Sequence, residues 1–455
     1  MNVLHKKTLV SLIVFILVVM LVFSGCTATK TTEEVTTKEI KIGIIGPMAG
    51  WASVYGQYVV DGVKLFLKEH NYMFKDRPIK LYIEDTQGQT DICLQKFDVL
   101  KNQDKVNVII GPSLGNEGVA AADWAKRNQD MVILVGYSAP EDLTMRDHSR
   151  NLLRPGWTGA HDTFYFGEFC AKSLGYKKII TVGQDYAYPW DQNAGFIRGF
   201  IENGGEEIYP IWHPVELLDF GSIMSQLQSL ASKYDAVFYN GSGAQAIAFF
   251  KQWNQYGMDK YYPQVLGGAN FTDPAILPEL GPKAEGVYSS MHYVDGAQTP
   301  ENLAFRAKFF EEYKRYPGAI ELQGYDAITV LFKALEVVDG NIENEEPLLN
   351  ALYNVKMPDS PRGPWYFDEY GEPVQNIYIQ RTVKVGDHLM NVPVKTYIAT
   401  TQFGPYKGLE KEYMSQPPNA RFYPPGKRDE YMKEIEKYLG KEYVDNLAKN
   451  KGWTE

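Results

Sequence analysis

Residues 111–115 read G-P-S-L-G and match a catalytic signature. A G-x-S-x-G turn between a strand and a helix is the nucleophile elbow of α/β hydrolases, whose serine attacks an acyl carbon. Ser113 would need an acid and a later histidine, for which only His292 and His388 are candidates, and no HGGG-type oxyanion segment is present. Short glycine/serine turns match this pattern by chance. An extracytoplasmic esterase that uses Ser113 therefore remains a minor alternative.

Metal, nucleotide and nucleic-acid chemistry have little support. The seven histidines are scattered without the spacing of metal ligands, and no loop alternates acidic residues as a calcium site does. The glycine-rich loop at 43–50 lies where phosphate-binding loops lie, but its spacing fits neither G-x-G-x-x-G nor a P-loop. The formal net charge is -10, which gives nucleic-acid binding no electrostatic support. We expect no metal, no cofactor and no nucleic-acid partner.

The N-terminus has the layout of a secretory signal. A short basic segment precedes an apolar stretch at 8–23, then Ser24, Gly25 and Cys26, then a Thr-rich polar segment. Small residues before a cysteine resemble a bacterial lipobox, in which the cysteine is diacylated, although Phe23 stands where leucine is usual. An uncleaved membrane anchor is the alternative. We predict a signal peptide at 1–25, a lipid-anchored linker at 26–38 and a location outside the cytoplasm, on the membrane.

The two other cysteines look like small buried residues. Cys93 lies near Phe97 at helical spacing, and Cys170 lies next to Phe169. Nothing in the sequence supports a disulfide between them. The location outside the cytoplasm also argues against the nucleotide interpretation of the glycine-rich loop, because nucleotides are scarce there.

From residue 40 the chain alternates apolar strands with amphipathic helices. The predicted strands are at 40–46, 79–85, 106–112 and 131–140, and in a second series at 177–185, 206–214, 234–242 and 262–270. Near-continuous apolar strands indicate parallel sheets that are covered on both faces. We expect an α/β fold of two doubly wound, Rossmann-like domains, with a ligand at the loops beyond the carboxyl ends of the strands.

Seven motifs, in order, resemble one family. They are "IKIGIIGPMAGWASVYG" with its following helix, "VIIGP", "SAPEDL", "LGYKKIITVGQDYAY", "YDAVFYNGSG", "AEGVYSS" and "GPWYFDEYGEPV". Together they resemble the type I periplasmic substrate-binding proteins of branched-chain amino acid ABC transporters, over about residues 39 to 400. Each motif is weak alone, but their order behind a lipobox is specific.

The resemblance implies two lobes that close on a ligand, joined by three crossing strands near 154–158, 289–293 and 361–367. The implied first lobe is 39–155 plus 291–361, and the second is 156–290 plus 362–400. Residues 401–455 exceed the family pattern, with a Pro- and Tyr-rich stretch followed by one or two short helices broken at Gly440. The sequence does not say whether this extension packs on a lobe or contacts a partner.

The resemblance also assigns ligand-binding positions. The family serine after "G-P" falls on Gly115, so Ser113 and Asn116 become candidate substitutes, and the next hydroxyl falls on Ser138. The predicted set is Trp51, Tyr55, Ser113, Gly115, Asn116, Tyr137, Ser138, Asp185, Tyr188, Ser242 and Asn270.

The family acid that pairs with the ligand ammonium falls near Ala269 and Asn270, neither of which is acidic. Since an unpaired buried ammonium is costly, either Asp185 supplies the charge or the ligand lacks an amino group. We hypothesise a small organic carboxylate or amide, with an aromatic ligand favoured by several aromatic residues, Phe271 among them, around the predicted cleft. Aromatics are 13% of the chain, so some of these could belong only to the core.

The implied function is to capture a small amino-acid-like, organic-acid or amide ligand and deliver it to an ABC permease. The alternatives are a ligand sensor for a membrane receptor and a structural surface lipoprotein. A lipid anchor without a cytoplasmic domain favours transport over sensing.

Overall fold

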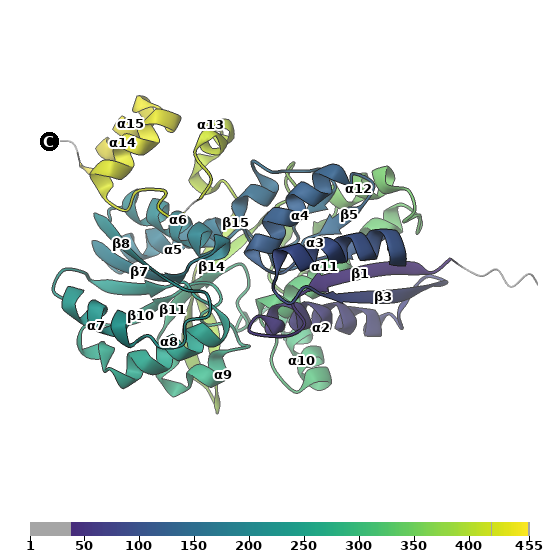
Figure 1. The fold of residues 1–455 in the computed structure, drawn as a ribbon, viewed down its shortest axis with the longest axis horizontal. Coiled ribbons are helices and arrows are strands. Elements are labelled where there is room, and N and C mark those ends of the chain that lie inside the picture. Colours follow the sequence, from purple (N-terminus) through teal and green to yellow (C-terminus); the bar gives the residue numbers. More distant parts are fainter. Residues whose placement is uncertain (1–37, 420, 454–455) are drawn as a thin grey trace, which may run out of the picture. The chain divides into compact units, whose positions relative to one another are not determined.

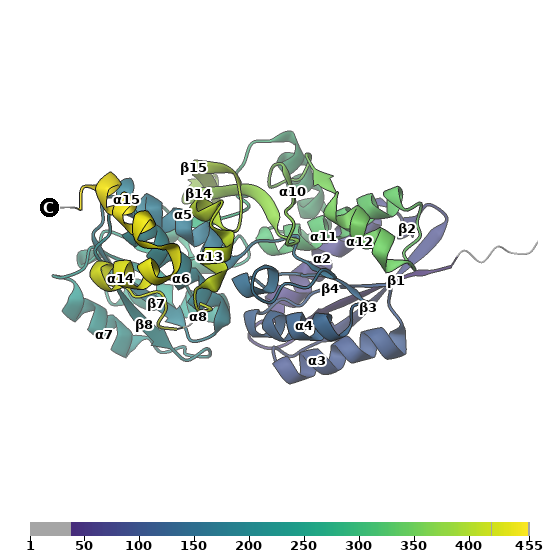
Figure 2. The same cartoon turned by 90° about the horizontal axis from the view of Figure 1, so that it is seen from above.

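The computed structural model describes residues 38–419 and 421–453. The predicted signal peptide, Cys26 and the linker up to residue 37 lie outside the described residues. From Glu39 onward the chain forms one compact unit, which contains two α/β lobes (Figures 1 and 2). None of the described helices is both long enough and apolar enough to cross a membrane.

The first lobe is built on a six-stranded sheet with the order β2-β3-β1-β4-β5-β6. Its strands pair in parallel except for β2 with β3. In chain order they are β1 (Ile40–Gly46), β2 (Met73–Phe74), β3 (Arg77–Asp85), β4 (Val108–Ile110), β5 (Val132–Leu134) and β6 (Leu152–Leu153). The strands that run through the middle of the sheet are buried and almost wholly apolar, as a sheet covered on both faces requires.

Helices cover both faces of this sheet. They are α2 (Ser53–Glu69), α3 (Thr90–Asp98) with a π-helical continuation at Val99–Asp104, α4 (Gly115–Arg127), α10 (Pro300–Tyr313), α11 (Ala319–Val337) and α12 (Glu345–Tyr353). A short 3-10 helix, η2 (Glu141–Thr144), lies between β5 and β6. Helix α2 buries an apolar face that includes Val59, Val63 and Phe66.

The second lobe is built on a nine-stranded sheet with the order β12-β13-β14-β11-β10-β9-β7-β8, and β15 pairs with β14. Its strands are β7 (Lys178–Gln184), β8 (Glu207–His213), β9 (Ala236–Tyr239), β10 (Val265–Gly267), β11 (Tyr288–Met291), β12 (Lys356–Met357), β13 (Trp365–Phe367), β14 (Pro373–Val385) and β15 (His388–Thr400). Its helices are α5 (Gly159–Lys172), α6 (Ala187–Ile201), α7 (Gly221–Leu230), α8 (Gly243–Gln255) and α9 (Leu277–Leu280). At the β12 end, Trp365 and Phe367 pack with the core of the first lobe.

The predicted fold class is confirmed, and each predicted strand corresponds to an observed one. The main difference in length is at 131–140, where only Val132–Leu134 forms a strand. The rest leaves the sheet, with Val135 N–H still donating to Leu153 O at 2.8 Å. The long hairpin of β14 and β15 was not predicted. The two cysteines are buried and free, in separate core clusters.

Glycines allow α5 and α6 to pack closely, which places the start of α6 beside the lobe boundary. A Cβ atom at Gly199 would lie 1.8 Å from Phe164 O, and one at Gly195 would lie 2.1 Å from Ala160 O. Neither position has room for a side chain, so the two helices contact each other through their backbones.

The C-terminal extension packs on the second lobe. It contains a 3-10 turn at Gly404–Tyr406, α13 (Glu410–Ser415), α14 (Arg428–Leu439) and α15 (Lys441–Lys451), which lie beside α5 and α6 in both views (Figures 1 and 2). Ile208 N–H donates to Gly426 O at 2.7 Å, so the extension also contacts the outer strand β8. The predicted break at Gly440 separates α14 from α15.

A buried ion pair lies where the chain leaves the first sheet. The Arg154 and Glu372 side chains are both inaccessible to solvent, with Arg154 Nε 2.6 Å from Glu372 Oε2. Arg154 Nη1 also donates to Pro140 O at 2.7 Å, and its Nη2 to Thr144 Oγ1 at 2.7 Å. The pair therefore fixes the loop after β5 against β14.

Candidate ligand-binding site

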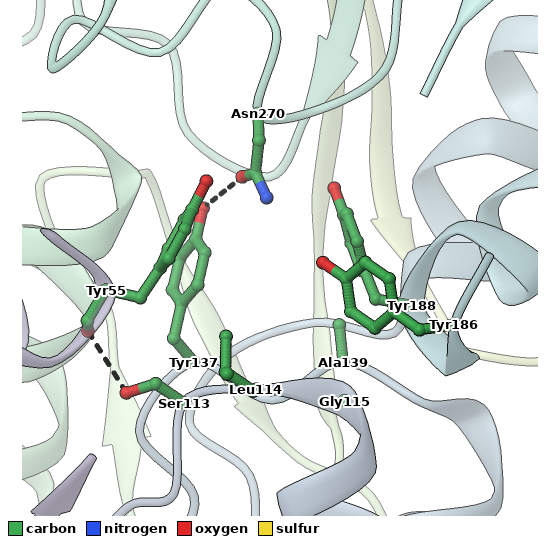
Figure 3. A pocket seen from close by; sticks show the side chains of 9 residues that line it. All are labelled: Tyr55, Ser113, Leu114, Gly115, Tyr137, Ala139, Tyr186, Tyr188 and Asn270. Atoms are coloured by element: carbon green, nitrogen blue, oxygen red, sulfur yellow. Dashed lines mark hydrogen bonds between the residues drawn. The ribbon is translucent and has the colours of Figure 1, made fainter. Parts of the chain in front are cut away.

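A narrow cavity lies between the two lobes, at the loops that follow the carboxyl ends of the strands (Figure 3). Its volume is about 10 Å³, room for about one water molecule, so a ligand enters only when the lobes or the lining side chains move apart. The residues that line it are Tyr55, Ser113, Leu114, Gly115, Tyr137 and Ala139 from the first lobe, and Tyr186, Tyr188 and Asn270 from the second.

Four tyrosines form two opposite walls. The rings of Tyr55 and Tyr137 are stacked with their centroids 5.9 Å apart, and those of Tyr186 and Tyr188 are 6.2 Å apart. Figure 3 shows the first pair on one side of the cavity and the second pair on the other. Burial raises the pKa of all four, to about 12 for Tyr186. The hydroxyls therefore stay protonated at neutral pH and can donate hydrogen bonds.

A hydrogen bond crosses the cavity from one lobe to the other. Tyr137 O–H donates to Asn270 Oδ1 at 2.7 Å. Within the described part of the chain, the buried Tyr188 hydroxyl and Ser138 Oγ have no hydrogen-bond partner. Buried hydroxyls without partners are costly, so the Tyr188 hydroxyl, which lines the cavity, is available to a polar ligand group or a bound water.

Helix α4 points its N-terminus at the cavity. Because it begins at Gly115, its first backbone N–H groups have no acceptor within the helix and favour an anion. Glu117 Oε2 accepts a hydrogen bond from Leu114 N–H at 3.2 Å. Burial raises the pKa of Glu117 to about 7, so this carboxyl carries less than a full negative charge near neutral pH.

The nine lining residues include no Asp, Glu, Lys or Arg. Asp185, the predicted substitute for the missing acid, is not among them. Its Oδ2 is 2.9 Å from Arg421 Nη1 of the C-terminal extension, and its Oδ1 accepts from Trp190 Nε1 at 3.0 Å. Asp185 is thus engaged elsewhere, and Asn270 offers only an amide.

Six of the eleven predicted site residues line the cavity: Tyr55, Ser113, Gly115, Tyr137, Tyr188 and Asn270. Trp51 and Asn116 line a second, wider depression beside it, and the Trp51 ring meets Tyr186 edge-on. Ser138 is buried behind the cavity, against Gly118.

Two other predictions about the second lobe need adjustment. Ser242 Oγ donates to Gln184 Oε1 at 3.1 Å and lies 3.5 Å from the Tyr186 hydroxyl, so it supports the wall without lining the cavity. Phe271 is fully buried in the core of the second lobe, where its ring meets Tyr239 and Phe250. Its position is decided by packing against α8.

Three lining residues were not predicted: Leu114, Ala139 and Tyr186. Each is next to, or two positions from, a predicted residue. The motif "QDYAY" contains this second tyrosine: Tyr186 immediately precedes α6, Tyr188 is its second residue, and both line the cavity.

Ser113 has the environment of a structural serine. Its Oγ donates to Tyr55 O at 3.1 Å, and no histidine is among the residues that line its cavity. His292, the first candidate partner, is fully buried and stacks on Trp157. His388, the second, lines a separate cavity between α9, α10 and the hairpin of β14 and β15.

Asp162 gives a test of the electrostatics behind this site. It accepts hydrogen bonds from Trp157 Nε1 and Ser290 Oγ, and burial raises its pKa from 3.8 to about 8. A carboxyl group whose pKa is raised in the folded state contributes stability at pH values below its unfolded pKa. This contribution is lost as the pH rises through the folded pKa.

We therefore expect Asp162→Asn to remove part of the pH dependence of stability. Between about pH 4 and about pH 8 the wild-type free energy of unfolding should fall relative to that of the variant, by at most about 1.4 kcal/mol per pH unit, and the melting temperature should fall with it. Thermal unfolding of both proteins across this range measures it. Parallel curves would show that Asp162 titrates normally.

A family model described as periplasmic binding protein matches residues 39–387. The Leu/Ile/Val-binding protein homolog 6 of Brucella melitensis is 25% identical, over 76% of this chain and 88% of that protein.

Two solved structures show similar relationships. A solute binding protein of an ABC transporter from Rhodopseudomonas palustris BisB5, in complex with 3,4-dihydroxy benzoic acid, is 30% identical with a TM-score of 0.75, over 81% of this chain and 99% of that one. An ABC transporter substrate-binding protein from Sphaerobacter thermophilus is 29% identical with a TM-score of 0.74, over 79% and 98%.

Proposed function

Because the chain belongs to the type I periplasmic binding proteins of the branched-chain amino acid family, which are the solute-binding proteins of ABC transporters, we propose that it captures a small aromatic carboxylate between its lobes. The observation that carries the proposal is a cavity walled by four tyrosines and lined by no charged side chain.

The lack of an acid argues against an amino acid ligand. An ammonium group in this cavity would lose its hydration and meet only hydroxyls and the Asn270 amide, which is costly without a carboxylate partner. Asp185 does not compensate, because it pairs with Arg421. A ligand without an amino group avoids this cost.

The first lobe suits the carboxylate. The N-terminus of α4, which begins at Gly115 on the cavity wall, offers backbone N–H donors. The raised pKa of Glu117 limits the negative charge behind this position. We place the carboxylate here.

The tyrosine walls suit an aromatic ring, since offset and edge-on ring contacts add to the energy of burial. The unpartnered Tyr188 hydroxyl and the Asn270 amide at the far end suit a ring hydroxyl. The structure from Rhodopseudomonas palustris with 3,4-dihydroxy benzoic acid, at 30% identity, supports a hydroxylated benzoate as the ligand class.

We further propose that the protein delivers this ligand to an ABC permease from a lipid anchor at Cys26, which rests on the sequence of residues 1–38. The proposed first lobe is 39–155 with 291–361, and the second is 156–290 with 362–400.

Ligand-induced stabilisation tests the proposal. We expect 3,4-dihydroxybenzoate and benzoate to raise the melting temperature. At a ligand concentration of a hundred times the Kd, the free energy of unfolding should rise by about 2.7 kcal/mol. Leucine at the same concentration should give no shift. A largest shift with leucine would contradict the proposal.

Asn270→Asp provides a matched variant. It keeps an acceptor for Tyr137 O–H but adds the negative charge that the cavity lacks. It should weaken benzoate binding by about tenfold or more, because the ligand carboxylate would share a buried cavity with a second negative charge, and tenfold corresponds to only about 1.4 kcal/mol of repulsion. Titration calorimetry on both proteins measures this, and unchanged affinity would place the ligand elsewhere.

A further inference from the structure

The C-terminal extension is attached to the second lobe by a cluster of tyrosines. Glu202, at the end of α6, is buried and accepts hydrogen bonds from the hydroxyls of Tyr406 at 2.5 Å, Tyr443 at 3.1 Å and Tyr431. Arg428 adds bonds from its guanidinium to the carbonyls of Gly204 and Gly205. The extension therefore moves with this lobe.

One part of the extension reaches the other lobe. Tyr413 O–H donates to Glu141 Oε2 at 2.9 Å, and Arg146 Nε donates to the carbonyls of Met414 at 3.1 Å and Gln416 at 3.0 Å. Glu141 and Arg146 lie between β5 and β6 of the first sheet. Tyr413 and Glu141 are both buried, so these are interior contacts.

The loop that the extension contacts also contributes residues to the candidate ligand site. Residues 135–146, here named the ligand loop, carry Tyr137 and Ala139, which line the cavity. Glu141 N–H donates to Asp191 Oδ2 of α6 at 2.5 Å. The ligand loop is thus held against the second lobe both directly and through the extension.

The extension also contacts a buried arginine of the second lobe. Arg198 of α6 donates from Nη1 to Asn419 Oδ1 at 2.9 Å, and its guanidinium carbon lies 5.0 Å from the centre of the Tyr413 ring. Tyr413 therefore contacts a cation of the second lobe with its ring and a carboxylate of the first lobe with its hydroxyl.

We propose that residues 410–419 form a strap that positions the ligand loop of the first lobe against α6 of the second, with Tyr413 as the positioning residue. The proposal rests on the proposed function only in taking the loop as ligand-binding. The root of the extension is bound to the second lobe through Glu202, and the strap contacts the ligand loop at Glu141 and Arg146. The strap therefore favours the arrangement in which the ligand loop lies against α6. The family match ends at residue 387, so the strap is an addition to the matched fold.

Tyr413→Phe and Tyr406→Phe form a matched pair. Each removes one buried hydroxyl that donates to a glutamate, but the Tyr413 bond joins the lobes and the Tyr406 bond stays within the second lobe. Hydrogen–deuterium exchange of the full chain, without any ligand, measures the amides of residues 136–146. We expect Tyr413→Phe to raise their exchange about tenfold and Tyr406→Phe to leave it as in the wild type.

Affinity gives the second readout, with 3,4-dihydroxybenzoate as the probe. Tyr413→Phe should weaken its binding by about three- to tenfold, because a smaller fraction of molecules holds the loop in place, while Tyr406→Phe should not. Equal exchange in the two variants, or unchanged affinity in Tyr413→Phe, would overturn the strap. If the probe fails to bind the wild type, the proposed ligand class fails, and the exchange experiment still decides on the strap.

Discussion

Gly115→Leu is expected to weaken ligand binding by about 10- to 100-fold while the chain stays folded. Gly115 is the first residue of α4 in the first lobe, and a Cβ atom there would lie 3.0 Å from Tyr188 N and 3.3 Å from Tyr188 Cβ in the second lobe. A leucine would hold the lobes apart and enter the cavity. Titration with 3,4-dihydroxybenzoate measures the loss.

The size of the residue provides the control. Gly115→Ala adds only the Cβ, which a shift of a few tenths of an ångström can accommodate, so its effect on affinity should be much smaller. Melting temperatures near that of the wild type would show that both variants fold, because the new side chain meets the lobe boundary and not the core of either lobe. A leucine variant with wild-type affinity would exclude this cavity as the ligand site.

Arg154→Leu is expected to lower the free energy of unfolding by about 3–5 kcal/mol, because it leaves a buried carboxylate without its partner. Glu372 loses the guanidinium at 2.6 Å, and the carbonyl of Pro140 and the hydroxyl of Thr144 lose a donor. Burial already raises the pKa of Glu372 to about 7. Without Arg154, which lowers it, the pKa of Glu372 rises further. The loss should therefore grow as the pH rises above about 7, where the wild-type carboxyl ionises but the variant must keep its proton or bury an unpaired charge.

Arg150→Leu is the matched control for this prediction. Arg150 also pairs with a glutamate, Glu346, at 2.7 Å, but the two side chains are 42% and 68% exposed. Exposed pairs contribute about 0–1 kcal/mol. Chemical denaturation of the two variants at neutral pH compares them, and equal losses would show that burial of the Arg154 pair has no special weight.

The fold could be predicted from the sequence more completely than the ligand-binding site. The segments at 40–46 and 177–185, which are rich in Ile and Val, could be predicted as buried parallel strands without knowing which strands lie beside them. A strand covered on both faces is recognised by its nearly continuous apolar residues. The hairpin of β14 and β15 was missed, since its polar and apolar residues mix without the period of a buried strand.

The site was predicted as a set of loops, and the tertiary structure chose among their side chains. Tyr137 and Asn270 are 133 positions apart and meet only because the lobes close on each other. Phe271, next to Asn270, turns into the core, since one peptide step reverses the side of the loop on which a side chain lies. Asp185 is the acid that the sequence offers to a ligand ammonium, but in the structure its Oδ2 lies 2.9 Å from Arg421 Nη1.

The sequence by itself therefore determined the alternation of strands and helices, the family and the absence of an acid at 269–270, because these depend on local periodicity and residue type. Only the tertiary structure decided which tyrosines face the cavity and where the C-terminal extension lies. Those outcomes depend on contacts between distant segments, such as Tyr413 with Glu141, that no local pattern records.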